Sequence, residues 1–319
     1  MNVIVSITLV IVVLLCSLIG RMYNFGEKFP KVKIVLNISL VIVVLIALFT
    51  IFFDSGVNKD KGWAIDYMNY KSIHKLSKGK SQKIALIDTG ISKFQINNDE
   101  KSIALVGNEY DNNGHGTILY SIIKGYGYGN EIEGIAPNTE IFSIKVMDID
   151  NPIKSSIIAQ AINKAIDAKC TIINISIGGY KYNDGISKAI DKAMAKGITV
   201  ISSSGDYKTV EMLFPANKKG VISVGASSSN FKTWDFTNAP DKCTIIAPGD
   251  EIKGIDNTKK IDSTSGTSQA TAIISGYVAL LKDYAYQNNV KLTNEKIISL
   301  LKSINNKTYN YVELFNQLH

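Results

Sequence analysis

Hydrophobic positions follow two different patterns along this chain, and the pattern changes near residue 54. Two stretches in the first part, residues 2–20 and 34–53, contain no charged side chain. Each is long enough to cross a hydrocarbon core of about 30 Å as a helix. Neither is accompanied by the basic first segment and small-residue cleavage site of a secretory signal. We therefore predict two transmembrane helices, which form a membrane anchor over residues 1–53.

Basic side chains near these stretches indicate how the chain crosses the bilayer. Between the stretches lie four of them: Arg21, Lys28, Lys31 and Lys33. Only Lys59 and Lys61 follow the second stretch closely. Because Lys and Arg are enriched in cytoplasmic loops, the chain is expected to be a multi-pass protein of the cell membrane with everything from about residue 54 on the extracytoplasmic side. The alternative is the same arrangement with the domain in the cytoplasm.

From residue 81 onward, short apolar runs alternate with helical patterns. The runs that predict strands are 83–88, 139–147, 171–177, 198–204, 221–226 and 244–249. The patterns that predict helices are 155–168, 185–197, 267–286 and 293–304. This alternation predicts an α/β domain over residues 81–319, with a doubly wound, mostly parallel sheet and helices on both faces. The polar, Lys-rich residues 54–80 are interpreted as a stalk, or otherwise as the first packed part of the domain.

Composition and charge exclude several kinds of protein. With 45% hydrophobic and 20% charged residues, most of the chain is expected to fold compactly. The net charge of +7 is spread through loops without a long basic run, so we expect no nucleic-acid partner. No C-x-x-C pair occurs, which argues against a zinc site, and Cys170 and Cys243 are expected to be buried free thiols. The sequence leaves the oligomeric state open.

Three residues from distant segments could together form a serine-based catalytic group. Ser268 lies in SGTSQATA, residues 265–272, at the start of a predicted helix, where a serine is by itself most simply a helix cap. His115 has a glycine on each side, and Asp88 ends the first predicted strand. A serine hydroxyl becomes a nucleophile when a base removes its proton and a third group orients that base. Because active sites gather at the carboxyl ends of parallel strands, Asp88 is well placed for this third role.

The segments around these residues resemble the three catalytic signatures of the subtilisin-like serine peptidases. These segments are DTG at 88–90, NNGHGT at 112–117 and SGTSQA at 265–270, and they follow the family's order of Asp, His and Ser. Further agreement comes from GIAPNTEIFSIKVM at 134–147, INISIGG at 173–179, FPANKKGVISVGA at 214–226 and IIAPG at 245–249. The resemblance covers roughly residues 81–304 and implies the subtilisin-like fold.

The resemblance implies amide hydrolysis through an acyl-enzyme. Ser268 would attack the scissile carbonyl, His115 would take and later return the proton, and Asp88 would hold the imidazole in the required tautomer. The backbone N–H of Ser268, at a helix start, would face the developing oxyanion. The segments implied to bind an extended peptide contain Ser176, Ile177, Gly178, Ser203, Ser204, Gly205 and Leu213.

Three positions depart from the family pattern. Asp206 stands where the family usually has an asparagine that donates to the oxyanion, and an ionised carboxylate cannot donate. This exchange predicts a slow or selective enzyme with an acid-shifted optimum. Leu213 replaces a smaller residue near the bottom of the primary specificity pocket and predicts a shallow pocket, and Ala272 replaces a proline. In addition, about 30 residues between the second apolar stretch and the first strand are too few for the family's propeptide, so folding without one is expected.

The function expected from the sequence is therefore a membrane-anchored serine endopeptidase with restricted processing of an exported peptide or leader. The alternative is a catalytically weak or inactive relative that binds peptides at the membrane. The expected partners are a peptide or protein substrate and the lipid bilayer. Catalysis requires no cofactor, and no metal site is predicted. A structural calcium ion is possible in this family, but no acidic loop of the sequence nominates its ligands.

Overall fold

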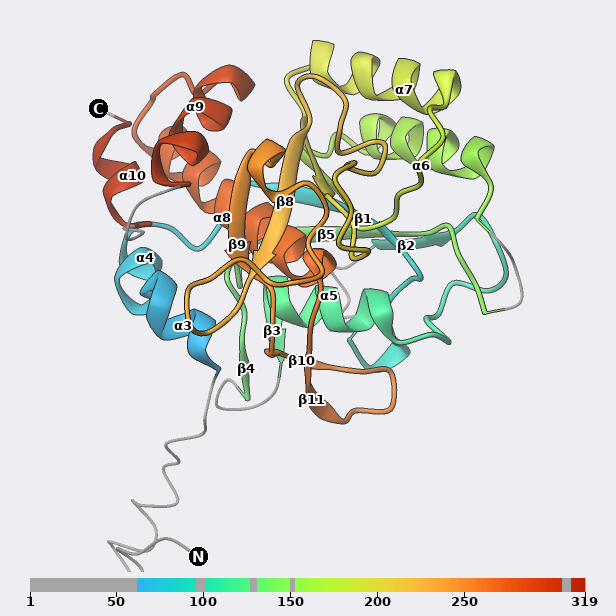
Figure 1. The fold of residues 1–319 in the computed structure, drawn as a ribbon, viewed down its shortest axis with the longest axis horizontal. Coiled ribbons are helices and arrows are strands. Elements are labelled where there is room, and N and C mark those ends of the chain that lie inside the picture. Colours follow the sequence, from blue (N-terminus) through green and yellow to red (C-terminus); the bar gives the residue numbers. More distant parts are fainter. Residues whose placement is uncertain (1–61, 96–100, 127–130, 150–152, 306–310, 319) are drawn as a thin grey trace, which may run out of the picture. The chain divides into compact units, whose positions relative to one another are not determined.

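A sheet of seven parallel strands forms the centre of the computed structural model, which describes residues 62–95, 101–126, 131–149, 153–305 and 311–318 (Figure 1). In chain order the strands are β1 Lys83–Asp88, β2 Lys101–Ala104, β5 Glu140–Lys145, β6 Ile172–Ile175, β7 Thr199–Ser203, β8 Ile222–Ser227 and β9 Ile245–Pro248. Their order across the sheet is β2-β5-β1-β6-β7-β8-β9. Asp88 pairs in register with Lys145 of β5, so β1 and β5 end together. The predicted, mostly parallel sheet is confirmed.

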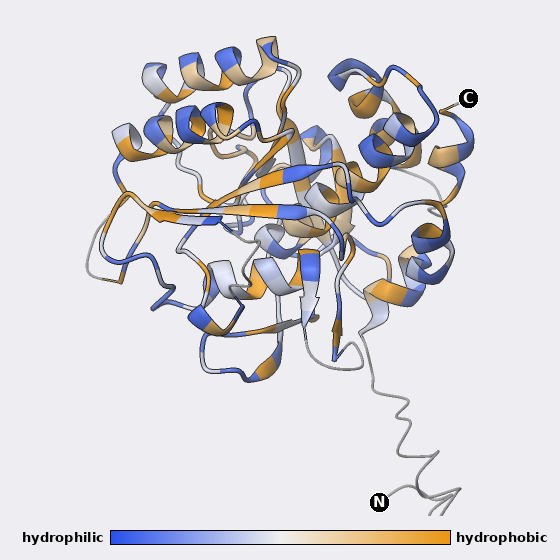
Figure 2. Ribbon diagram, turned by 180° about the vertical axis from the view of Figure 1, so that it is seen from behind, coloured by the Kyte–Doolittle hydropathy of each residue, from blue (hydrophilic) through white to orange (hydrophobic). Residues whose placement is uncertain are grey.

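Helices cover both faces of this sheet. One face carries α6 Ser155–Asp167 and α7 Asp184–Ala195; the other carries α5 His115–Lys124 and α8 Thr267–Gln287, with α9 Asn294–Ile304 and α10 Glu313–Asn316 beyond them. Strand β1 shows why two layers are needed. Ile84 and Leu86 join the core on the α8 side, whereas Ala85 and Ile87 join the core on the α6 side. In Figure 2 the hydrophobic colour accordingly follows the central strands, and the outer helices carry both colours.

Two short antiparallel pairs complete the described secondary structure. The first joins β3 Gly125–Tyr126 to β4 Ile132–Glu133. The second joins β10 Ile252–Ile255 to β11 Ile261–Thr264, just before α8. The loop between β10 and β11 reaches the segment before α5, where the Asn257 amide donates to the carbonyl oxygen of Asp111. The hairpin thus supports the segment that leads into α5.

Residues 63–76 belong to the packed domain. They form α3 Trp63–Met68 and α4 Tyr70–Leu76, whose side chains Met68, Tyr70 and Ile73 are buried in the α8-side core. Of the two interpretations of residues 54–80, packed elements therefore describe the chain from Trp63 onward. No helix within the described ranges has both the length and the apolar character needed to pass through a bilayer. The predicted transmembrane stretches, 2–20 and 34–53, lie outside the described residues.

A single carboxylate holds the segment after α4 in place. Asp283 of α8 is buried and accepts hydrogen bonds from Ser77 Oγ at 2.7 Å, Gly79 N at 3.1 Å and Ser81 N at 2.9 Å. Burial acts to raise the pKa of Asp283, but the hydrogen bonds from Ser81, Ser77 and Gly79 outweigh it, so that the pKa lies below its ordinary value. The ionised carboxylate is therefore the form that stabilises the fold.

Asp283→Ala is predicted to lower the free energy of unfolding by about 3 kcal/mol, because several donors lose a charged acceptor. The lowered pKa sets the sign of the pH dependence. The contribution is fully present above the pKa of the unfolded chain, about 3.9, and is lost as the pH falls through the lower folded value. Denaturant unfolding of the full chain at a series of pH values checks this. Asp167→Ala, which removes an exposed carboxylate at the end of α6, should change little; an equal loss in both variants would contradict the prediction.

Candidate active site

Asp88 and His115 meet at the carboxyl end of β1. The Asp88 side chain has no exposed surface, and its Oδ1 lies 2.7 Å from Nδ1 of His115 and accepts from the Thr89 backbone N–H at 2.8 Å. An ionised carboxylate only accepts, so the imidazole donates from Nδ1. This leaves Nε2 as the free basic atom of the ring. The contact predicted between these two residues is present.

Gly116 permits this contact. A Cβ atom at that position would lie 2.2 Å from the carbonyl oxygen of Gly90 and 3.2 Å from Oδ1 of Asp88, which is too close. Its backbone N–H donates to Oγ1 of Thr89 at 2.8 Å. The first turn of α5 can therefore press against the turn that follows β1. The close approach expected from the glycines beside His115 is thus observed.

Three carboxylates determine the charge of the imidazole. Burial lowers the pKa of His115, but the charge and hydrogen bond of Asp88, together with the charges of Asp111 and Asp206, outweigh burial and raise the pKa above its ordinary value. The effect of Asp206 also shows that the segment after β7 and the start of α5 share one electrostatic environment. The surroundings of His115 therefore favour the protonated ring.

Asp111 is a functional residue that the sequence analysis did not identify. It is buried, and its Oδ1 accepts from the N–H groups of Asn113 and Gly114, both at 2.9 Å. Its Oδ2 accepts from Thr117 N at 3.0 Å and Thr117 Oγ1 at 2.5 Å. These bonds fix both the approach to α5 and its first turn. An Asp four residues before His115, with Thr117 shortly after it, was the available signal in the sequence.

Lys145 also stabilises the segment that leads into α5. Its side chain is fully buried at the end of β5, and its ammonium donates to the carbonyl oxygen of Tyr110 at 2.7 Å. Oδ2 of Asp148 lies 3.3 Å from that nitrogen and compensates its charge. Because Tyr110 precedes Asp111, the partly buried Lys145–Asp148 ion pair stabilises the segment that leads to His115.

Ser268 lies in the first turn of α8, at the same edge of the sheet. Its side chain is 8% exposed, and its hydroxyl donates to the carbonyl oxygen of Ser176 at 3.4 Å. Ser176 directly follows β6, the neighbour of β1. Within the described part of the chain, Ser268 makes its side-chain hydrogen bond to Ser176 and none to His115. Catalytic hydrogen bonds are often long or unformed without substrate, so this geometry leaves the predicted role open.

Asp206 caps α8. Its Oδ1 accepts from the backbone N–H of Thr267 at 2.9 Å and from Oγ1 of Thr267 at 2.7 Å. A carboxylate is favoured at a helix N-terminus, where it meets unpaired N–H groups and the positive end of the helix dipole. The residue next to Ser268 is thus held by the side chain that replaces the family's asparagine. This capping contact was not anticipated from the sequence.

Leu213 lies between the two segments predicted to bind peptide. A Cβ atom at Gly178 would be 2.9 Å from Cβ of Leu213, and one at Gly205 would be 2.8 Å from its Cγ. The Leu213 backbone N–H donates to the carbonyl oxygen of Ser204 at 3.0 Å. The buried leucine therefore fills the space between the segments after β6 and β7. The predicted set does not all line one surface, since Ile177 packs into the α6-side core.

The described residues offer no group of three or more His, Cys, Asp or Glu side chains that could hold a metal ion. Cys170 and Cys243 are buried and free, as the sequence predicts. Burial raises the pKa of Cys170 to about 12 and that of Cys243 to about 11. These thiols are therefore protonated packing residues at neutral pH.

Comparison with known proteins supports the resemblance stated above. The model of the "Subtilase family" matches residues 79–314. The "Thermostable alkaline protease" of Halalkalibacterium halodurans is 29% identical over 233 residues, which are 71% of this chain and 64% of that protein. The "Major intracellular serine protease" of Bacillus subtilis is 30% identical over 243 residues, 70% of this chain and 76% of that protein.

Solved structures show the same fold. The prenylagaramide maturation protease PagA superposes with a TM-score of 0.68 at 25% identity and covers 78% of this chain and 98% of its own. A mutant of the protease domain of PatA superposes with a TM-score of 0.67 at 22% identity, covering 76% of this chain and 98% of its own.

Asp111→Asn is predicted to lower the pKa of His115, because one of the negative charges that raise it is removed. The amide also has one acceptor oxygen where the carboxylate has two, so either the Asn113 and Gly114 N–H groups or Thr117 lose their acceptor and the approach to α5 loosens. Titration of the histidine ring signals by NMR checks the direction. Asp167→Asn removes an exposed and distant carboxylate and serves as the control. An unchanged His115 titration in Asp111→Asn would show that this carboxylate acts on the backbone alone.

Proposed function

Because the chain belongs to the subtilase family, we propose that it is a serine endopeptidase in which Ser268 is the nucleophile, His115 the general base and acid, and Asp88 the orienting carboxylate. The observation that carries the proposal is the 2.7 Å contact between the buried Asp88 carboxylate and Nδ1 of His115. It leaves Nε2 as the atom that can take the Ser268 proton. The family implies a peptide or protein substrate.

The proposed reaction has two steps. Ser268 attacks the scissile carbonyl while His115 takes its proton, and the imidazolium then protonates the leaving amine. Water is activated by the same imidazole to release the acyl group. The Ser268 backbone N–H lies in the first helical turn, whose N–H groups have no intrahelical acceptor. It is the oxyanion donor that this chain's own backbone offers.

Asp206 makes the oxyanion site weaker than an asparagine would. As a carboxylate it donates no hydrogen bond, and its negative charge at the start of α8 opposes the charge that develops on the substrate oxygen. The same charge contributes to the raised pKa of His115, so the base is lost at a higher pH than an ordinary histidine. The acid-shifted optimum expected from the sequence is therefore opposed by the environment of His115.

The physiological role is proposed to be restricted processing. A residue that slows turnover suits limited cleavage better than digestion, and the similar protease PagA is named for maturation. We further propose that residues 1–53 anchor the protein in the cell membrane through the stretches 2–20 and 34–53, with a peptidase domain from about residue 81 on the extracytoplasmic side. The charge-free length of both stretches and the basic loop between them support this.

One observation favours a second candidate, a catalytically weak or inactive peptide-binding membrane protein: the Ser268 hydroxyl bonds to Ser176 and not to the imidazole. A fluorophosphonate probe separates the two. We expect labelling of the full chain and none of Ser268→Ala, because the probe reacts with an activated serine. If neither the full chain nor Ser268→Ala is labelled, and an unfolding transition shows that both are folded, the result would favour the inactive peptide-binding protein.

Asp206→Asn is predicted to raise kcat at neutral pH about tenfold or more, since loss of such a donor costs subtilisin about 10²–10³-fold. The amide oxygen can still accept from Thr267 while its nitrogen becomes a donor. The acid limb of kcat/KM should also move to lower pH, because a charge near His115 is removed. Asp206→Ala is the matched control: it loses the cap, gains no donor and should not accelerate the reaction. Equal rates for Asn and Asp would contradict the donor argument.

Leu213→Gly is predicted to change specificity more than rate. Removing the side chain opens the space between Gly178 and Gly205, so kcat/KM for substrates with a large side chain before the scissile bond should rise at least tenfold relative to small ones. A peptide library varied at that position measures this. Leu213→Met, of similar volume, should keep the preference for small residues. A wild-type preference for Phe or Arg there would refute the shallow pocket.

A further inference from the structure

Aromatic side chains gather where the chain enters the described domain. Trp63 and Tyr67 of α3 lie 5.7 Å apart between ring centroids, and Phe231, from the loop after β8, stacks on Tyr67 at 4.8 Å with an interplanar angle of 22°. The same loop continues to Trp234 and Phe236, whose rings are 5.1 Å apart. We call these five side chains the aromatic face.

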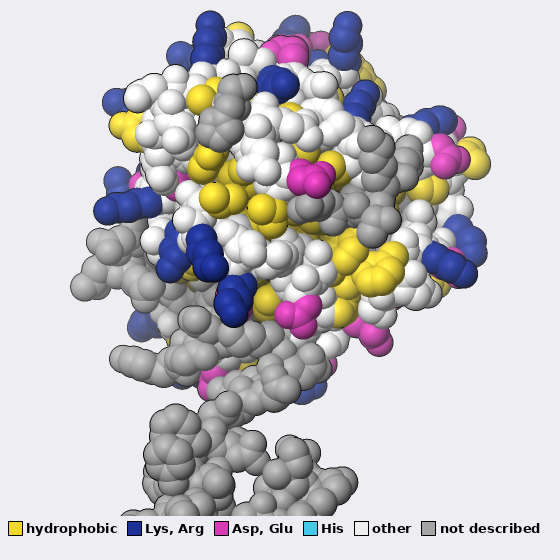
Figure 3. All heavy atoms as spheres, turned by 90° about the vertical axis from the view of Figure 1, so that its left-hand side faces the viewer, with side chains coloured by type: hydrophobic (Ala, Val, Ile, Leu, Met, Phe, Trp, Pro, Cys, Tyr) yellow, Lys and Arg dark blue, Asp and Glu magenta, His cyan; other side chains and the backbone are white. Residues whose placement is uncertain are grey.

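This face exposes apolar area. Phe231 is 62% exposed and Phe236 is 53% exposed, although both are large hydrophobic residues. Phe231 also adopts a left-handed backbone conformation, with φ of 64°, which bulky residues rarely do. Figure 3 looks onto the side of the domain that carries α3 and α4, and hydrophobic side chains gather there, with both basic and acidic ones around them. Contiguous exposed apolar groups mark a surface that is covered in use.

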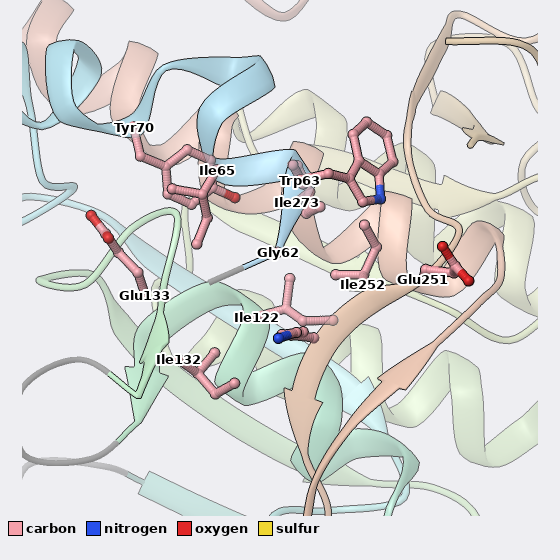
Figure 4. A pocket seen from close by; sticks show the side chains of 12 residues that line it. Gly62, Trp63, Ile65, Tyr70, Ile122, Ile132, Glu133, Glu251, Ile252 and Ile273 are labelled. Atoms are coloured by element: carbon pink, nitrogen blue, oxygen red, sulfur yellow. The ribbon is translucent and has the colours of Figure 1, made fainter. Parts of the chain in front are cut away.

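Trp63 joins the aromatic face to the domain by a hydrogen bond. The Trp63 indole N–H donates to the carbonyl oxygen of Asp250 at 2.8 Å, so its polar atom is satisfied within the protein. Beneath α3, Ile122, Ile252 and Ile273 line a cavity of about 20 Å³, room for about one water molecule (Figure 4). Trp63, the first ring of the aromatic face along the chain, is thus held in place before anything binds to it.

We propose that the aromatic face lies in the headgroup region of the lipid bilayer and orients the peptidase domain on it. The inference rests on the proposed membrane anchor. Eight residues, 54–61, separate the end of the second apolar stretch from Gly62, and a chain of that length spans at most about 28 Å. The start of α3 therefore cannot lie far from the point where the stretch 34–53 leaves the bilayer. Trp and Tyr are the residues that membrane interfaces favour.

The position of the face also defines the substrate. The loop that carries Phe231, Trp234 and Phe236 is bonded to the segment after Asp206, because Lys208 N donates to the carbonyl oxygen of Phe236 at 2.9 Å. A docked aromatic face would therefore hold Asp206, and with it the start of α8, close to the lipid surface. The substrates that reach it are peptides leaving or lying along the membrane.

The two tryptophans of the chain, Trp63 and Trp234, both belong to the aromatic face and serve as probes. The full chain is reconstituted into vesicles made with or without a phospholipid brominated close to its headgroup. We expect the protein to float with the vesicles and its tryptophan emission to fall with bromine. Phe231→Ser with Phe236→Ser should float equally but lose much of this quenching. Tyr286→Ser, which removes an exposed ring at the end of α8, should leave the quenching unchanged.

Each outcome separates the proposals. Flotation without quenching, or with quenching that the double variant keeps, overturns the aromatic face and leaves the anchor standing. Failure to float overturns the anchor and the face together, whereas probe labelling of Ser268 tests the peptidase independently. Shielding of both tryptophans from a water-soluble quencher without bromine quenching would assign the face to a protein partner or a second copy, and would also overturn the lipid proposal.

Discussion

A carboxylate with no exposed surface holds an imidazole at the end of a parallel strand, and the described domain is arranged around that contact. Burying an ionised carboxylate is costly unless a charged or hydrogen-bonded partner compensates it, and His115 is that partner for Asp88. The contact needs β1 to end beside the first turn of α5, which Gly116 allows and the bonds of Asp111 enforce. Fold and chemistry therefore share one constraint: the edge of the sheet must bring together segments that are far apart in the sequence.

Asp206 links the stability of the start of α8 to the proposed chemistry. By accepting hydrogen bonds from Thr267 it fixes the residue beside Ser268, and its charge contributes to the raised pKa of His115. An asparagine would keep most of the hydrogen bonding to Thr267 and would remove the negative charge that contributes to the raised pKa of His115. Under the proposed function, the chain would combine a capped α8 helix with a weaker oxyanion site, a combination suited to a protease that cleaves few bonds.

The sequence predicted the parts of this structure that depend on local pattern. Apolar runs alternating with helices predicted six of the seven strands of the sheet, all but the short edge strand β2. The DTG and NNGHGT segments identified the Asp88–His115 contact. The features that the sequence did not predict depend on contacts between residues that are far apart in the chain. The capping of Thr267 by Asp206 joins residues 61 positions apart. Leu213 fills a space that exists only once β6 and β7 lie side by side, and α3 and α4 were obscured by their polar, Lys-rich composition. The role of Ser268 as the nucleophile stays a prediction, since its hydroxyl donates to Ser176 and not to His115.

The hydrogen bond from the Ser268 hydroxyl to the carbonyl oxygen of Ser176 has a consequence for selectivity. Ser176, whose carbonyl oxygen accepts from Ser268, stands at the edge proposed to pair with an extended peptide. A peptide strand added there brings its own N–H groups to compete for the acceptors of that edge. In the proposed mechanism, this competition would free the Ser268 hydroxyl to turn toward the imidazole of His115. A bound peptide strand would therefore raise the reactivity of Ser268 above the level that a small probe measures.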